Sequence, residues 1–248
     1  MKTQQPLHVA TPVRQSPALT KVAGTPVYLK LDSSQPTGSF KIRGIGHFCK
    51  TALNESIEYG QQLVANNPGW IFISPFDDPL IWRKPGAIVL SVGGGGLLNG
   101  VVEGLRRVNW ADVPIVAIET DGAHCLNAAM KAGKLVTLPA ITSVATTLGL
   151  IRVSAQTMKL VGEHIVFSEV VSDQEAVKAV EHFVDDEKIL VEPACGAALS
   201  AVYSRIIGKL QSEGKLAKEL GPVVVVVCGG NNISMEELRR LKKQLGMI

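Results

Sequence analysis

The chain contains few cysteines, and they are not paired in sequence. Cys49, Cys125, Cys195 and Cys228 lie far apart among 248 residues, with no Cys-x-x-Cys motif. Disulfide frameworks and structural zinc sites require more closely spaced cysteines. The sequence therefore predicts reduced thiols rather than a disulfide scaffold or a zinc centre.

Strong charge of either sign is also absent. The 25 basic and 22 acidic residues are spread along the chain, the net charge is +3, and only 5% of the residues are aromatic. Proteins that bind nucleic acid usually combine a basic patch with aromatic stacking residues. Nucleic acid is therefore not an expected partner.

Long apolar runs are missing as well. The longest, residues 223–228, is far shorter than the roughly 20 residues that span a bilayer. No amino-terminal apolar segment with a cleavage site is present. With 46% hydrophobic residues for a core, these features predict a folded cytoplasmic protein with no membrane partner.

The most informative stretch is residues 87–100, AIVLSVGGGGLLNG. Its first half is an apolar run without alternation, which predicts a parallel strand covered on both faces. Gly93, Gly94, Gly95 and Gly96 then precede an apolar helix, and backbone N–H groups at such a turn bind phosphate together with the helix dipole. We predict an anion-binding turn; the alternative is a tight turn that needs glycine only for its dihedral angles.

Two familiar kinds of phosphate site fit this stretch poorly. No Gly-Lys-Ser/Thr follows the glycines, which argues against a nucleoside-triphosphate loop. A dinucleotide site stays open as an alternative, because Glu119 ends the next expected strand, where an acid could bind a ribose hydroxyl. Leu98, however, occupies the place of the third glycine of that motif.

The remaining sequence predicts strands that alternate with helices, which is typical of an open parallel α/β sheet. Ser39 is an expected N-cap that places Lys41 in the first turn of a helix, and Ser172 with Glu175 forms an expected capping box. Prolines at positions 75, 79 and 85 argue against a helix there. The expected strands cover residues 27–31, 70–73, 87–92, 114–118, 164–171 and 223–227; the expected helices cover 52–65, 97–107, 123–132, 154–160, 173–186, 193–210 and a last one opened by Ser234.

Ligands of parallel α/β sheets gather at the carboxyl ends of the strands. Three such ends stand out: residues 93–96, Glu119 with residues 122–125, and residues 228–230. On chemistry alone Lys41 would be a solvated surface lysine and Cys228 a small core residue. The convergence of the three ends predicts a site there.

Five motifs carry a resemblance to a known family: GSFKIRG at 38–44, GGGGL at 93–97, ETDGAH at 119–124, EPACGAA at 192–198 and VCGGN at 227–231. With them the chain resembles the serine dehydratase/threonine deaminase family of pyridoxal-phosphate enzymes, from Leu7 nearly to its carboxyl end. The resemblance implies an α/β, tryptophan-synthase-β-like sheet of fold type II and a homodimer. It also implies β-elimination of water from L-serine, giving pyruvate and ammonia, and from L-threonine, giving 2-oxobutanoate.

The resemblance implies roles for particular residues. Lys41 would carry pyridoxal 5′-phosphate as a Schiff base and then take the Cα proton of the substrate. Phe40 would pack against the pyridine ring, and Cys228 would lie beside its nitrogen. The phosphate would be held by the backbone N–H groups of Gly93, Gly94, Gly95, Gly96 and Leu97.

A monovalent cation such as K⁺ is also implied, close to the phosphate. Glu119 would be its only charged ligand. The alternative is that the Glu119 carboxylate only caps nearby N–H groups at the end of its strand. A thiol is a poor ligand for a hard cation, which makes the place of Cys125 in the shell doubtful. The implied shell consists of Gly93, Glu119, Ala123, Cys125, Leu148 and Leu150.

The chain departs from the family in two places. Relative to it, segments are missing between Lys50 and Leu53 and between Trp82 and Lys84, and no Ser-x-Gly-Asn-Ala substrate loop occurs. We expect residues 1–50 and 83–248 to build the large domain and residues 51–82 to be a remnant of a small domain that is largely absent. A truncated, catalytically impaired protein that acts as an assembly partner is therefore the alternative to an active lyase.

Overall fold

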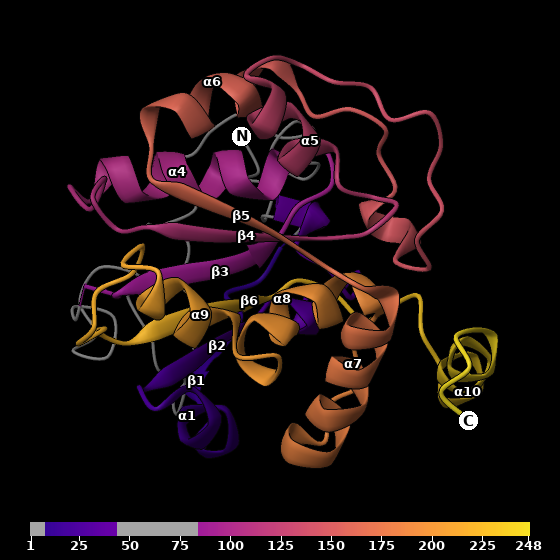
Figure 1. Cartoon of the computed structure of the whole chain (residues 1–248). Helices are drawn as coiled ribbons and strands as arrows, with labels where there is room; N and C mark the ends of the chain where they lie inside the picture. The colour runs from indigo at the N-terminus through magenta and orange to yellow at the C-terminus, as the bar shows by residue number, and fades with distance from the viewer. Residues whose placement is uncertain (1–7, 44–83) are drawn as a thin grey trace, which may run out of the picture.

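The computed structural model describes residues 8–43 and 84–248 (Figure 1). The helix expected at 52–65 and the strand expected at 70–73 lie outside these residues. Among those described, no helix combines the length and apolarity that crossing a membrane requires.

The described residues form a six-stranded sheet in the order β1-β2-β6-β3-β4-β5. β1 pairs with β2 in antiparallel fashion, and the other neighbours are parallel. The carboxyl ends of five strands therefore lie at one edge of the sheet, as expected for an open α/β fold. The strands are β1 (Val13–Gln15), β2 (Val27–Leu31), β3 (Ala87–Ser91), β4 (Ile115–Thr120), β5 (Val166–Val171) and β6 (Val223–Val227).

Burial explains why the apolar runs form the centre of the sheet. All six residues of β4 are buried, and β3 and β6 each expose one residue only in part. β-branched side chains pack well on a pleated surface that helices cover on both faces. Apolar runs without alternating polar residues thus correctly predicted the central strands.

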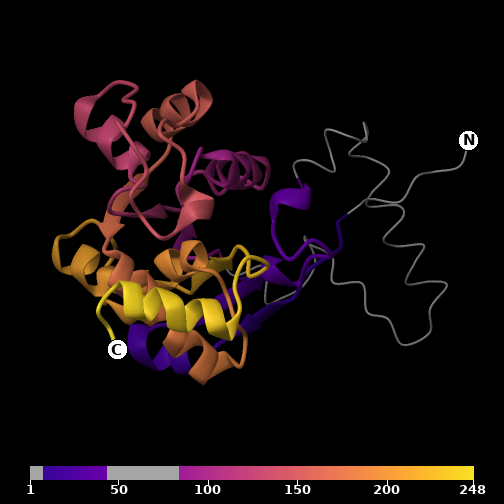
Figure 2. The same ribbon diagram turned by 90° about the vertical axis from the view of Figure 1, so that its right-hand side faces the viewer.

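Helices cover the sheet on both sides (Figure 1). α4 and α5 pack against α6 on one side, and α8 packs against β3, β4 and β6 on the other, with α1, α7 and α9 around it. In the view turned by 90°, α10 (yellow) lies in front, across the face toward the viewer, and it contacts α7 (Figure 2). The helices are α1 (Pro17–Ala23), α4 (Gly96–Arg107), α5 (Cys125–Ala132), α6 (Ala155–Glu163), α7 (Asp173–Glu187), α8 (Pro193–Tyr203), α9 (Ile206–Ser212) and α10 (Met235–Gln244), with short 3₁₀ turns η1 (Asp32–Ser34) and η2 (Thr146–Leu148).

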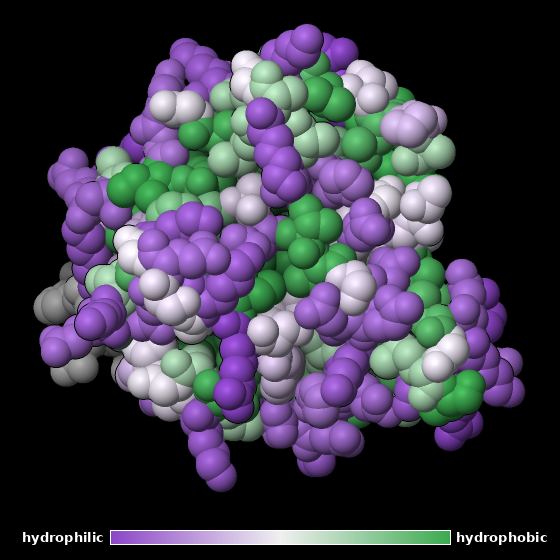
Figure 3. Space-filling view, viewed as in Figure 1, coloured by the Kyte–Doolittle hydropathy of each residue, from purple (hydrophilic) through white to green (hydrophobic). Residues whose placement is uncertain are grey.

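The two faces of these helices differ in polarity. The outer surfaces of α7 and α9 are mostly hydrophilic, and hydrophobic side chains show mainly between the helices (Figure 3). α8 is an exception, because ten of its residues from Pro193 to Val202 are buried. A Cβ at Gly196 would lie 2.2 Å from the carbonyl oxygen of Ala176 in α7, so the close packing of these two helices requires glycine.

Most predicted elements are confirmed within one or two residues, including the capping box of Ser172 and Glu175 and the Ser234 N-cap of α10. The helix expected over 193–210 is wrong in one respect, because it is two helices. Arg205, at φ 57°, takes a left-handed conformation between α8 and α9, although neither glycine nor proline marks the break.

The expected N-cap at Ser39 is also wrong. Ser39 forms a β-bridge with Gly229, and the helical conformation begins at Lys41. Pairing with a distant segment has thus replaced the local cap. The sequence analysis did not identify β1 and α1, although Ser16 caps α1 and Pro17 begins it, which is a recognisable start signal.

Candidate active site

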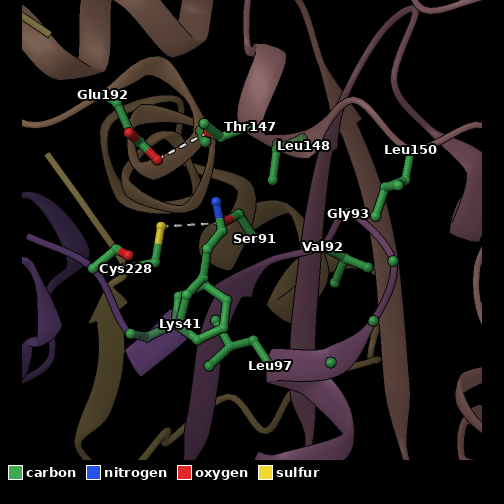
Figure 4. Close-up of a pocket in the computed structure, with 16 residues that line it drawn as sticks. Lys41, Ser91, Val92, Gly93, Leu97, Thr147, Leu148, Leu150, Glu192 and Cys228 are labelled. Carbon is green, nitrogen blue, oxygen red and sulfur yellow. Dashed lines mark hydrogen bonds between the residues drawn. The ribbon is translucent and has the colours of Figure 1, made fainter. Parts of the chain in front are cut away.

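A cavity of about 200 Å³ opens at the carboxyl ends of β3 and β6 (Figure 4). Its walls come from five parts of the chain: the segment around Lys41, the end of β3 with its glycine turn, residues 147–150, the start of α8 and the residue after β6. The lining residues are Ser39, Phe40, Lys41, Ser91, Val92, Gly93, Gly94, Gly95, Gly96, Leu97, Thr147, Leu148, Leu150, Glu192, Ala194 and Cys228.

The glycine turn presents unused N–H groups to this cavity. Within the described part of the chain, the backbone N–H groups of residues 93–97 make no hydrogen bond. They lie at and just before the amino-terminal end of α4, where the helix dipole favours an anion. The predicted anion-binding turn therefore has free donors around the cavity.

Close packing explains why the turn is built from glycine. Gly95 has φ 95°, and a Cβ there would lie 2.0 Å from Thr157 Oγ1. A Cβ at Gly94 would lie 2.6 Å from the Leu150 side chain, and one at Gly93 3.2 Å from the carbonyl oxygen of Leu148. The loop of residues 148–150 and the start of α6 thus press the turn against the cavity.

Lys41 is held at the cavity by backbone pairing between distant segments. The N–H of Phe40 donates to the carbonyl of Cys228 at 3.0 Å, and the N–H of Gly230 donates to the carbonyl of Gly38 at 3.1 Å. The Lys41 Nζ points into the cavity (Figure 4), and no hydrogen bond or ion pair joins it to a described residue. Its amine is therefore free to react with a ligand.

An ion pair between the partly exposed Arg43 and the buried Asp32 fixes the helical turn that carries Lys41. Arg43 donates to both carboxylate oxygens of Asp32, at 2.8 and 2.9 Å, and to Thr11 Oγ1 at 3.1 Å. Burial alone would raise the pKa of Asp32, but hydrogen bonds from Arg43 and Thr11 lower it. The carboxylate thus remains charged and holds the Arg43 guanidinium in place.

Cys228, paired with the segment that carries Lys41, also lines the cavity. Its Sγ lies 3.5 Å from Ser91 Oγ, within hydrogen-bonding distance. The hydrogen bond from Cys195 is the main cause of a lowered pKa of Cys228, which burial opposes. Cys228 is thus a buried residue whose thiol offers a polar group to the cavity.

Two polar residues of the cavity were not identified from sequence. Thr147 Oγ1 donates to Glu192 Oε1 at 2.9 Å, and among the lining residues that the structure describes the Glu192 side chain is the only carboxylate. The EPACGAA motif contained Glu192, but only the fold brings it to the end of β6. Thr147 comes from η2, for which the sequence carried no distinct signal.

Glu119 lies behind the glycine turn rather than in the cavity. It is fully buried, and its two oxygens accept from the N–H groups of Leu126 at 2.8 Å and Asn127 at 2.7 Å. Burial raises the pKa of Glu119 to about 7, and these two hydrogen bonds oppose the shift. Glu119 therefore caps α5, and the dinucleotide interpretation loses the acid that it required at the ligand.

The implied cation shell is partly brought together. Cys125 Sγ donates to the carbonyl of Gly93 at 3.6 Å, and Leu148 packs on Gly93 from the other side. Burial and the nearby Glu119 raise the pKa of Cys125 to about 11, so its thiol stays protonated and is a poor ligand. Within residues 8–43 and 84–248, no three His, Cys, Asp or Glu side chains gather as a metal-binding group.

The structure thus sorts the predicted site residues into two groups. Phe40, Lys41, the four glycines, Leu97 and Cys228 line one cavity, together with Leu148 and Leu150. Glu119, Ala123 and Cys125 are buried behind the glycine turn.

Comparison with known proteins finds the same family that the sequence motifs indicate. A family model described as pyridoxal-phosphate dependent enzyme matches residues 5–56 and 47–229. The L-serine dehydratase/L-threonine deaminase of Mus musculus is 52% identical over 322 positions that cover this whole chain and 98% of that protein; that of Homo sapiens is 51% identical with the same coverage. Among solved structures, the fungal L-serine ammonia-lyase from Rhizomucor miehei superposes with a TM-score of 0.78 at 31% identity, over 97% of this chain and 99% of the other.

The comparison also bears on the missing segments. The alignment with the mouse protein runs over 322 positions, 74 more than the 248 residues of this chain. The family model matches in two pieces that meet at residues 47–56, where the first missing segment was expected. The relatives therefore contain internal segments that have no counterpart here.

Proposed function

Because the chain belongs to the family of pyridoxal-phosphate dependent enzymes, we propose that it deaminates L-serine to pyruvate and ammonia, and L-threonine to 2-oxobutanoate. The observation that carries this proposal is one cavity that contains a free lysine amine, a turn of unused N–H groups and a thiol. Relatives that are about half identical carry the names of both activities.

The residues of the cavity fit pyridoxal 5′-phosphate. The N–H groups of residues 93–97 would bind the phosphate, and Lys41 would bind the aldehyde carbon. Phe40 and Cys228 would contact the ring, with the thiol at its nitrogen. The cofactor, when bound, supplies an aldehyde that joins to amines and a conjugated ring that withdraws electrons from the substrate Cα.

The chain itself supplies positioning and proton transfer. The Lys41 amine, which lines the cavity, takes the Cα proton of the amino acid. The pairing of residues 38–40 with 228–230 keeps the backbone that carries Lys41 beside Cys228. The hydrogen bond from Thr147 to Glu192 orients both side chains where they line the cavity.

A monovalent cation such as K⁺ would bind behind the glycine turn. Glu119 is buried without a cationic partner among the described residues, which favours a positive ion beside it. The carbonyl groups of Gly93 and Leu148 would be ligands, and the Cys125 thiol would not.

We further propose that the protein is a cytoplasmic homodimer that acts in amino-acid catabolism and supplies pyruvate for gluconeogenesis. The family resemblance supports this part of the proposal.

The shortfall of 74 positions supports a second candidate. A chain that lacks the substrate loop would bind the cofactor but turn over slowly, and would act by assembling with a complete enzyme. Loss of walls that exclude water and hold the substrate carboxylate lowers catalysis without removing the Lys41 site.

One set of measurements separates these candidates. The purified protein should show a visible absorbance band that borohydride removes, with a pyridoxyl group on the Lys41 peptide. Lys41→Ala should lose the band, whereas Lys134→Ala, at an exposed lysine after α5, should keep it. Pyruvate release from L-serine supports the active lyase; a band that responds to L-serine without pyruvate supports the impaired partner; a colourless protein that ignores added cofactor contradicts both.

A further inference from the structure

One wall of the cavity comes from the loop between α5 and α6, residues 133–154. This loop, all of which the structure describes, contains the short turn η2 but neither a strand nor an α-helix. It contributes Thr147, Leu148 and Leu150 to the lining of the cavity. Leu148 and Leu150 also pack on Gly93 and Gly94. The position of the loop therefore determines the shape of the wall and the fit of the glycine turn.

The outer side of this loop is not closely packed. A second cavity of about 200 Å³ lies there, lined by residues 142–144 and 146–147 of the loop and by α10. Thr147 and Glu192 line both cavities, so the hydrogen bond between them belongs to the wall that the two cavities share. On this side, hydrogen bonds rather than packing must hold the loop.

Asp173, the first residue of α7, makes two of these hydrogen bonds. Its two carboxylate oxygens accept from Ser143 Oγ at 2.6 Å and from the N–H of Val144 at 2.9 Å. Ser143 Oγ also accepts from the N–H of Ala145 at 3.0 Å and lies 2.7 Å from Thr120 Oγ1 at the end of β4. Hydrogen bonds to a carboxylate are stronger than those between neutral groups. A half-buried carboxylate thus anchors the loop to the carboxyl ends of β4 and β5.

Backbone hydrogen bonds connect this anchor to the cavity. The N–H of Thr146 donates to the carbonyl of Val144 at 2.9 Å, and the N–H of Leu148 donates to the carbonyl of Ala145 at 2.9 Å. The residues on either side of Thr147 are therefore bonded to the residues that the anchor holds. A displacement of Val144 and Ala145 would move the wall of the cavity.

We propose that Asp173 is a positioning residue of the cavity, which fixes the wall formed by Thr147 and Leu148. Asp173 lines neither cavity, so it acts through the loop. The proposal rests on the proposed function, because pyridoxal 5′-phosphate is the ligand expected in the cavity. Binding groups that are displaced by about 1 Å lose much of their effect, so release of the loop should weaken cofactor binding.

Asp173→Ala removes both acceptors, and Glu175→Ala is the matched control. Glu175 lies in the same first turn of α7, and its side chain accepts from Ser172 in the capping box. Both replacements weaken the start of α7, so urea unfolding should show lower stability for both variants. Only Asp173→Ala releases the loop.

Two measurements separate the variants. Hydrogen exchange of the cofactor-free protein should be about tenfold faster or more over residues 142–150 in Asp173→Ala and unchanged there in Glu175→Ala. Equilibrium dialysis should give a Kd for pyridoxal 5′-phosphate that is about tenfold higher or more in Asp173→Ala and unchanged in Glu175→Ala. A merely structural role of Asp173 would lower the stability of both variants and leave both Kd values unchanged.

Asp173→Asn is the milder replacement, because it keeps one acceptor for the N–H of Val144. It should change both measurements in the same direction by less, and it serves as the test if Asp173→Ala does not fold. Parent-like exchange or a parent-like Kd in the Asp173 variants, or equal effects in Glu175→Ala, would overturn the proposal. A parent protein that does not bind the cofactor would contradict the proposed function, and the exchange rates would then decide alone whether Asp173 holds the loop.

Discussion

The N–H of Phe40 donates a 3.0 Å hydrogen bond to the carbonyl of Cys228, and this bond decides where Lys41 lies. Ser39 bridges to Gly229 and Gly230 to Gly38 in the same short antiparallel pairing. The free amine, the thiol and the glycine turn therefore belong to one rigid edge of the sheet. Changes that loosen this pairing should reduce cofactor binding even when they lie outside the cavity.

Arg43→Met tests that expectation. The change removes the partly exposed guanidinium that donates to the buried Asp32 carboxylate and leaves it Thr11 and the nearby Lys30, which should cost roughly 1–3 kcal/mol in the free energy of unfolding. The first helical turn after Phe40 should loosen, and the Kd for pyridoxal 5′-phosphate should rise. Urea unfolding and equilibrium dialysis give the two values. Arg107→Met removes only an exposed pair with Glu103 and should change stability by less than about 0.5 kcal/mol; equal effects of both variants would contradict the role of Arg43.

Two glycines in and beside the turn should respond in opposite directions. Gly95→Ala forces a side chain into a left-handed conformation and against Thr157, which should destabilise the protein by about 2 kcal/mol or more and weaken phosphate binding. Gly100→Ala, at an exposed position inside α4 with open space around it, should stabilise by about 0.5–1 kcal/mol. Thermal unfolding with and without added inorganic phosphate measures both effects. A Gly95→Ala protein as stable as the parent would show that the turn is not constrained by α6.

The sequence predicted the central sheet well because the signals for it are local. β3, β4 and β6 are apolar runs whose burial on both faces removes any alternation. The capping box of Ser172 and Glu175 lies within four residues. The break at Arg205 has no such signal, because an ordinary residue takes the left-handed conformation there.

The site was less accessible to sequence reasoning for a related reason. Lys41 is an unremarkable residue until residues 38–40 pair with 228–230, a contact that no local pattern encodes. The family resemblance, rather than periodicity or spacing, selected it. Thr147 likewise reaches the cavity only because η2 meets the start of α8 in the fold, where it donates to Glu192.

Glu119 makes stability depend on pH in an unusual direction. Its pKa is raised from 4.5 to about 7 in the folded protein, mainly by burial, so between these values the folded state binds more protons than the unfolded state. The free energy of unfolding should therefore fall as pH rises through this range, by up to about 3 kcal/mol from this group. Urea unfolding from pH 5 to pH 8 measures the slope, and Glu119→Gln should remove most of it. Glu237→Gln, at an exposed acid of α10 whose pKa is lowered by Arg240, should leave it unchanged.

The same measurement tests the cation behind the glycine turn. A K⁺ ion next to Glu119 would stabilise the carboxylate, so saturating K⁺ should flatten the pH slope of the parent protein relative to tetramethylammonium at the same ionic strength. Glu119→Gln should show no difference between the two salts, because it has no charge for the ion to stabilise. If the parent gives the same slope in both salts, Glu119 acts only as the cap of α5 that its hydrogen bonds to Leu126 and Asn127 describe.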